Sequence, residues 1–107
     1  MADFEEQQAI TAELQIDQVQ TADGTHAPAV VRCIRGPVHL GAHFFQVRDQ
    51  ESIDLQLTRI VCLGRPVDAL DPAHTALVTL RGTDADRLRP GNTTAGWQII
   101  QGSNPTT

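Results

Sequence analysis

The chain has 107 residues, enough for one domain with a single hydrophobic core but too few for a catalytic domain and a separate regulatory one. Acidic side chains number 13 and basic ones 8, all arginine, and the formal net charge of -5 argues against a general nucleic-acid coat. No apolar run approaches the roughly 18 residues that span a bilayer, and the acidic start does not resemble a secretory signal. We expect a cytoplasmic protein with no membrane partner.

Short runs of sheet-forming residues, separated by turn residues, follow one another along most of the chain. Residues 1–11 contain few apolar side chains and are predicted to form a flexible tail. From residue 12, apolar and polar side chains alternate, as in a strand with one face on the core. Val19 falls out of this alternation, which predicts a β-bulge near Asp17-Gln18. Further strands are expected over residues 29–34, 38–40, 43–47, 53–62 and 76–80.

One of these strands, the run that begins at residue 53, changes phase along its length. Ile53, Leu55 and Leu57 share one parity, whereas Ile60 and Cys62 share the other. This shift predicts a bend near Thr58-Arg59. Such a bend would leave Val61 and Leu63 partly exposed.

A short strand over residues 43–47 contains two adjacent phenylalanines, which cannot face the same way. Because Val47 shares the parity of Phe45, we expect Phe45 in the core and Phe44 under a loop.

The C-terminal part predicts one helical turn and one strand. Thr83 is placed to cap a turn over residues 83–88, where acidic side chains favour the helix dipole. A last strand is expected from about residue 93 to residue 100. Residues 101–107 are predicted to form a flexible tail. The folded part is therefore a single domain over residues 12–100, and six or seven short strands predict an all-β barrel or sandwich.

Glycines recur at characteristic distances within this pattern. A strand leads into the turn Arg35-Gly36, and Gly41 follows five residues later. Leu80-Arg81-Gly82 then precedes the helical turn, which ends at Gly91. This order resembles domain 2 of translational GTPases such as elongation factor Tu, over residues 12–95. The resemblance implies a closed six-stranded Greek-key barrel, here as a free-standing domain without the GTPase domain.

Several residues depart from what that family uses to bind its ligands. The chain contains neither a Gly-x-x-x-x-Gly-Lys-Ser/Thr loop nor any lysine, so we expect no GTP binding by this chain. In the tRNA-carrying members, an acidic side chain lies against the terminal adenosine of the tRNA. The matching position in this chain is Val61. Arg59 and Val31 stand where those members have glycine. We therefore do not expect the barrel to bind aminoacyl-tRNA.

The same strand provides the first candidate site. If the predicted bend exposes Val61 and Leu63, these side chains would form an apolar patch together with Arg59 and with His74 on the following loop. The alternative is that Val61 and Leu63 pack under the long connection after them. Our interpretation is a non-catalytic binding module that docks another protein, of unknown identity, through this patch.

A second candidate site is a cationic patch of Arg35, Arg81, Arg87 and Arg89. It would make the protein an RNA- or ribosome-associated accessory factor. The alternative is that these arginines pair with neighbouring acids such as Asp84 and Asp86. The net charge disfavours nucleic acid.

Metal, cofactor and catalytic chemistry have weak support in the sequence. His39 and His43 have the spacing of a helical zinc pair, but they fall in a strand-forming region. Cys33 and Cys62 are interpreted as buried thiols, with a disulfide between neighbouring strands as the alternative. We expect no metal, no cofactor and no catalytic residue; a small enzyme using His74 or Cys62 is a minor alternative.

Overall fold

A computed structural model of the protein describes residues 10–20, 24–48, 51–88 and 98–105. The strands in these ranges are β1 (Ala12–Val19), β2 (His26–Arg35), β3 (Val38–His39), β4 (His43–Val47), β5 (Ser52–Cys62), β6 (Arg65–Val67), β7 (Ala69–Leu70), β8 (Thr75–Arg81) and β9 (Gln98–Ser103). A single 3-10 turn, η2 (Ala85–Arg87), is the helical element in the same ranges. None of the described residues form a helix that is long and apolar enough to cross a membrane.

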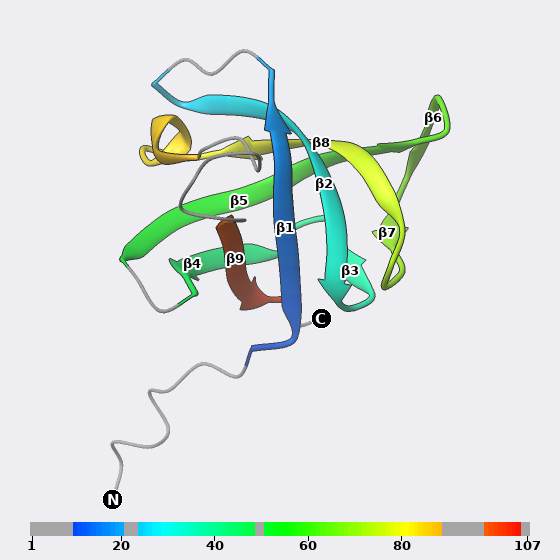
Figure 1. Ribbon diagram of the computed structural model, residues 1–107, viewed down its shortest axis with the longest axis horizontal. Coiled ribbons are helices and arrows are strands. Elements are labelled where there is room, and N and C mark those ends of the chain that lie inside the picture. The colour runs from blue at the N-terminus through cyan, green and yellow to red at the C-terminus, as the bar shows by residue number, and fades with distance from the viewer. Residues whose placement is uncertain (1–9, 21–23, 49–50, 89–97, 106–107) are drawn as a thin grey trace, which may run out of the picture.

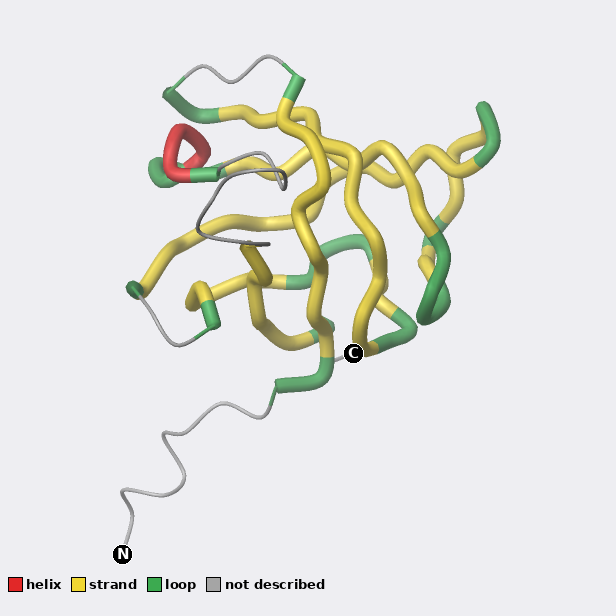
Figure 2. The backbone as a smooth tube through the Cα atoms, viewed as in Figure 1, coloured by secondary structure: helices red, strands yellow, loops and turns green. Residues whose placement is uncertain are grey.

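Six of the strands close into an antiparallel barrel (Figure 1). Their order is β4-β9-β1-β2-β8-β5, and a pairing between β4 and β5 completes the circle. The prediction of an all-β, closed six-stranded barrel is confirmed. β6 lies outside the circle, paired only with the end of β5, and the resulting β5–β6 hairpin projects from the body of the barrel (Figure 2).

Inward-facing side chains from all six barrel strands fill the core. The most completely buried large ones are Leu14, Ile16, Val31, Phe44, Leu55, Leu57, Ile60, Val78, Leu80 and Ile100. Both predicted irregularities are confirmed. The β1–β2 register shifts between Ile16 and Gln18, and the β5–β8 register shifts between Leu57 and Arg59. Because each shift inserts one residue, core residues on either side of it are separated by three positions instead of two.

The prediction for the two phenylalanines is wrong. Phe44 is fully buried, whereas Phe45 is only half-buried. The cause is another bulge, between Phe44 and Gln46, in the pairings of β4 with both of its neighbours. It allows Phe44 and Val47 to face the core together.

The C-terminal boundary also needs correction, because residues 101–103 belong to β9 and are not a tail. Gln101 and Gly102 are buried, and β9 lies between β1 and β4 as a barrel strand. Asn104 then ties this end to the β2–β3 turn: its side chain accepts from the His39 N–H at 2.8 Å and donates to the Pro37 carbonyl at 2.9 Å. The predicted tail over residues 1–9 and the predicted strand over residues 93–97 lie outside the described residues.

The helical turn forms where it was predicted, but with a different residue at its start. Asp84, not Thr83, occupies the N-cap position of η2. The Asp84 carboxylate accepts the backbone N–H of Asp54 at 2.9 Å, which fastens the turn to β5.

Barrel closure requires a glycine at position 102. A Cβ atom there would lie 2.6 Å from the Phe44 Cα atom and would overlap the His43 carbonyl group. These atoms belong to the backbone of β4, which cannot rotate away as a side chain can. The two strands therefore approach more closely than any side chain at position 102 would allow.

We predict that Gly102→Ala lowers the free energy of unfolding by about 3 kcal/mol or more, because the added methyl group pushes β9 away from β4. Urea denaturation followed by circular dichroism measures this loss. Gly24→Ala is the matched control, since a Cβ atom at position 24 meets nothing within 4 Å. We expect that control to stay within about 0.5 kcal/mol of wild type. Equal stability of the two variants would contradict the assignment of residue 102 to the barrel seam.

Candidate functional site

The projecting β5–β6 hairpin ends in a two-residue turn, Leu63-Gly64, between the paired residues Cys62 and Arg65. The φ angles of Leu63 and Gly64 are 54° and 79°, so both turn residues are left-handed, as in a type I′ turn. Asparagine, aspartate and glycine are usual at the first of these positions, because a left-handed residue with a bulky side chain costs roughly 1–2 kcal/mol. Leu63 is nonetheless present there, with 96% of its surface exposed.

The connection between β7 and β8 contains a second residue of this kind. Ala73 has a φ of 74° and is, with Leu63, one of two non-glycine residues with positive φ in the described ranges. Two backbone hydrogen bonds to Cys33 hold the connection in place: Ala73 N–H to the Cys33 carbonyl at 2.8 Å, and Cys33 N–H to the His74 carbonyl at 2.9 Å. The end of β2 therefore fixes the left-handed conformation of Ala73.

These two residues line the same pocket, which has a volume of about 380 Å³ and which we call the hairpin-tip pocket. Its lining residues are Cys62, Leu63, Ala73, His74 and Thr75. The Cys62 thiol donates to the Thr75 carbonyl at 3.8 Å and connects the hairpin to the start of β8. Strained backbone conformations cluster at binding and catalytic sites, because the surrounding structure has to maintain them at a cost. Because Leu63 and Ala73, the two left-handed non-glycine residues, line the same pocket, we take this pocket as the candidate site.

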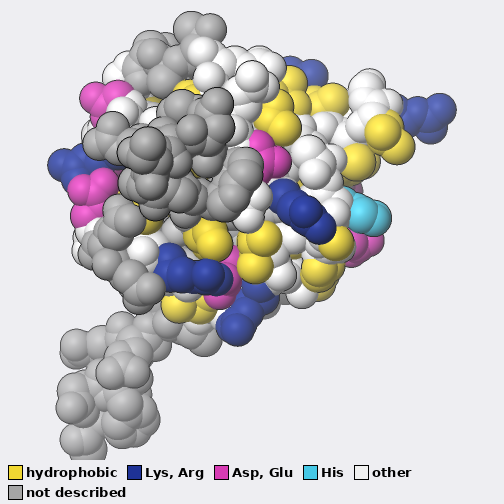
Figure 3. All heavy atoms as spheres, in the orientation of Figure 1, with side chains coloured by type: hydrophobic (Ala, Val, Ile, Leu, Met, Phe, Trp, Pro, Cys, Tyr) yellow, Lys and Arg dark blue, Asp and Glu magenta, His cyan; other side chains and the backbone are white. Residues whose placement is uncertain are grey.

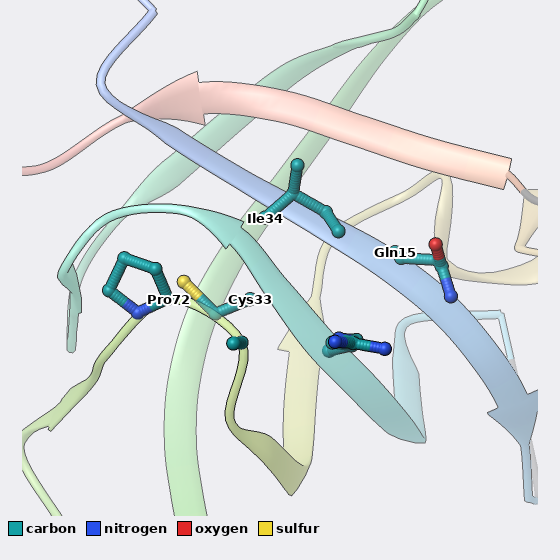
Figure 4. Close-up of a pocket in the computed structure, with 6 residues that line it drawn as sticks. Gln15, Cys33, Ile34 and Pro72 are labelled. Atoms are coloured by element: carbon teal, nitrogen blue, oxygen red, sulfur yellow. The ribbon is translucent and has the colours of Figure 1, made fainter.

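A smaller pocket of about 270 Å³ lies on the other side of the same connection (Figure 4). Its lining residues are Gln15, Arg32, Cys33, Ile34, Pro72 and Ala73. The Cys33 side chain points toward the Pro72 ring in this view, and Gln15 lies on β1. Ala73 borders both pockets, so the β7–β8 connection is a wall shared between them.

An apolar strip crosses the outer face of the sheet beside the hairpin-tip pocket. Strand register places Val30 beside Leu77, Leu77 beside Val61, and Val61 beside Pro66, on four successive strands. These side chains point away from the core, since their sequence neighbours Val31, Val78 and Ile60 are buried inside it. Three of the four are half-buried and Pro66 is exposed. We call Val30, Leu77, Val61 and Pro66 the apolar row; hydrophobic side chains gather on this face toward the projecting hairpin in Figure 3.

The first predicted group of site residues falls within this region. Leu63 and His74 line the hairpin-tip pocket, Val61 belongs to the apolar row, and Arg59 is exposed on β5 opposite Thr79. The alternative, in which Val61 and Leu63 pack under the following connection, holds only in part: β6 covers one side of Val61, but Leu63 is uncovered.

Other residues of the region were not foreseen. The members Val30, Leu77 and Pro66 of the apolar row come together through strand register, which no local pattern in the sequence reveals. The Leu63-Gly64 turn was the one available signal for a hairpin here, but leucine is not a residue that favours a left-handed turn.

The second predicted group, the arginines, is dispersed. Arg35 ends β2, whereas Arg81 pairs with His26 at the beginning of β2, so strand spacing separates them by roughly 30 Å. Arg87 is ion-paired with Asp84 at 3.2 Å and with Glu51 at 3.1 Å. Arg89 lies outside the described residues.

Arg35 instead takes part in a polar ladder across the barrel seam. The buried carboxylate of Glu13 binds Arg35 at 3.6 Å and also binds Arg48. The Gln101 side chain extends the ladder: it donates to the Glu13 carboxylate and accepts from the Gln46 side chain at 2.6 Å. No local sequence pattern reveals this ladder, because its members lie up to 88 positions apart.

Both cysteines are free thiols, so the disulfide alternative does not hold. Cys33 is buried, and burial raises the pKa of its thiol to about 11, with the negative charge of Asp71 adding to the effect. Cys62 and His74 line the same pocket, but the described contact of the thiol is with the Thr75 carbonyl and not with the imidazole. His39 and His43 belong to different strands, and His43 pairs with Asp54 at 2.7 Å.

The closed six-stranded barrel has the fold of domain 2 of the translational GTPases, which confirms the resemblance expected from the sequence. Among solved structures, it is similar to the apo form of translation elongation factor SelB from Methanococcus maripaludis, with a TM-score of 0.67 and 14% sequence identity. The match covers 87% of this chain and 19% of the elongation factor, and at this identity it establishes the fold alone. No protein-family model matches the chain, and no curated protein matches it in sequence.

We predict that iodoacetamide at about pH 8 alkylates Cys62 in the folded protein and leaves Cys33 unmodified, because the thiolate is the reacting form and Cys33 is both buried and neutral. Mass spectrometry of peptides after native and denatured labelling measures the two rates. Alkylation of Cys33 at the rate of Cys62 would contradict its position in the core.

The raised pKa of Cys33 also predicts a pH dependence of stability. The folded pKa of about 11 exceeds the ordinary value of 9.0, so the folded state retains a proton that the unfolded state loses. Stability from this group is complete below pH 9 and is lost as the pH rises through 11. The difference in unfolding free energy between wild type and Cys33→Ala, measured from pH 8 to pH 11, should shrink over that window.

Proposed function

We propose that this protein is a non-catalytic barrel module of the translation-factor type that binds another protein in the cytoplasm. The proposed binding surface consists of the hairpin-tip pocket and the adjoining apolar row. The observation that carries the proposal is Leu63, which is 96% exposed and left-handed at the end of a projecting hairpin.

Energetics support a role for Leu63 in a complex. In the free protein, this side chain contributes nothing to the core and costs roughly 1–2 kcal/mol in backbone strain. Burying a leucine against a partner is worth about 1.5–3 kcal/mol, which exceeds that cost. A large apolar side chain that is presented on a rigid hairpin beside a pocket has the character of an interface hot spot.

The alternative of an RNA- or ribosome-associated accessory factor has less support. Of its four arginines, three are described, and these do not favour a single patch, because Arg35 is at the far end of β2 from Arg81 and Arg87 is engaged by two carboxylates. The similarity of the fold to part of a translation elongation factor supports a link to translation within the proposal. Since this chain matches 19% of that protein, its activity is not transferred.

We predict that Leu63→Asn raises the free energy of unfolding by about 1 kcal/mol, because asparagine tolerates the left-handed conformation better than leucine. The same variant should lose partner capture from an extract of the native cells, measured by quantitative mass spectrometry of the bound proteins. Leu63→Ala is the matched variant for stability: it loses the apolar side chain but retains a residue that disfavours positive φ, so it should lose capture without gaining stability.

Ile34→Thr is the control for the binding half of this experiment. Ile34 is also an exposed large apolar side chain, at 38%, but it lines the smaller pocket on the other side of the β7–β8 connection. We expect Ile34→Thr to retain capture. Partners that remain bound to both Leu63 variants would show that the hairpin tip is not the binding surface.

A further inference from the structure

We infer that the partner contributes an acidic, amphipathic segment, whose apolar side chains cover the apolar row while its carboxylates bind Arg32 and Arg59. This inference rests on the proposed function and specifies the chemistry of the partner at the same surface.

The arginines of the described residues fall into two sets. Arg35, Arg48 and Arg87 each have a carboxylate within ion-pair distance. Arg32, Arg59, Arg65 and Arg81 are exposed and have no ion-pair partner in the described part of the chain. In a protein with 13 acidic and 8 basic side chains, four exposed arginines without an ion pair among the described residues are unexpected, since acids are in excess.

Two members of the unpaired set lie on either side of the apolar row. Strand register places Arg32 opposite Thr75 and Arg59 opposite Thr79, and Leu77 of the apolar row stands between these two threonines on β8. Arg65 follows the Leu63-Gly64 turn at the end of the hairpin. The apolar surface therefore has a cationic border, and charge complementarity requires an acidic border on the partner.

Strand spacing also limits the length of the partner segment. Arg32 and Arg59 are separated by four residues along β8 and by two strand spacings across the sheet, roughly 17 Å in total. An extended segment covers that distance in about five residues at 3.3 Å each. Two carboxylates about five positions apart, with apolar side chains between them, match this arrangement.

We do not expect such a segment to bind by pairing as an additional strand with the edge of β6. This strand has only three residues, and the central one is Pro66, which has no N–H group to donate. The partner is therefore expected to lie across the side chains of β2, β8, β5 and β6.

A protein segment fits this surface better than RNA does. Single-stranded nucleic acid is bound by cationic grooves that also present aromatic side chains for base stacking. Among the described aromatic residues, Phe44 is buried in the core and Phe45 lies on β4, which is not one of the strands of the apolar row. The row offers aliphatic side chains instead, and these favour apolar side chains of a protein.

Selection from a random peptide-display library on the whole chain tests this inference. We expect the enriched peptides to carry leucine, isoleucine or phenylalanine flanked by aspartate or glutamate. A synthetic copy of an enriched peptide should bind the double variant Arg32→Gln/Arg59→Gln about tenfold more weakly than wild type. Arg87→Gln is the matched control, because its guanidinium is already ion-paired, and it should bind like wild type.

The outcomes separate this inference from the proposed function. Enriched peptides with basic or uncharged flanks that no longer bind Leu63→Asn would overturn the acidic partner and leave the protein-binding surface in place. Peptides that bind wild type and Leu63→Asn equally would overturn the surface itself. A mixed-sequence single-stranded RNA that binds wild type and displaces the peptide would favour the nucleic-acid alternative and overturn the acidic partner.

Discussion

The architecture depends on one constraint, which is that β5 has to pair with different strands along its length. Its first half pairs with β4 and closes the barrel, whereas its second half lies between β8 on one edge and β6 on the other. A regular strand of 11 residues would not keep one face on the core through this change of partner. The bulge at Thr58 solves the problem by inserting one residue. The core then continues through Ile60, and the outer face gains Arg59 and Val61.

Much of the fold follows from residue order, because strands with one buried face show it as alternation. The phase shifts in β1 and β5 could be located, since several core residues lie on each side of each bulge. The bulge in β4 could not be located from the sequence, because Val47 is the one core residue that follows the bulge in a strand of five residues. The end of β9 was missed for a different reason: glycine, serine, asparagine and proline favour turns locally, and only closure of the barrel makes this segment a strand.

The candidate site could be predicted only in part. The exposure of Leu63 followed from the shift in β5, which can be read along one strand. The apolar row could not be foreseen, because Val30, Leu77, Val61 and Pro66 become neighbours only through register. The pairing of arginines is likewise a tertiary property. Near the seam, Glu13 binds two guanidinium groups, whereas Arg32 and Arg59 are exposed and have no ion-pair partner among the described residues.

The position of β9 has a consequence for how the protein folds during synthesis. β9 follows every other barrel strand in the chain, yet it lies between β1 and β4. Until it emerges from the ribosome, the facing edges of β1 and β4 have no partner, and the apolar interior is open along that side. Non-local pairing of this kind is slow, and unpaired edges promote aggregation. The nascent chain is therefore most vulnerable just before its last strand arrives.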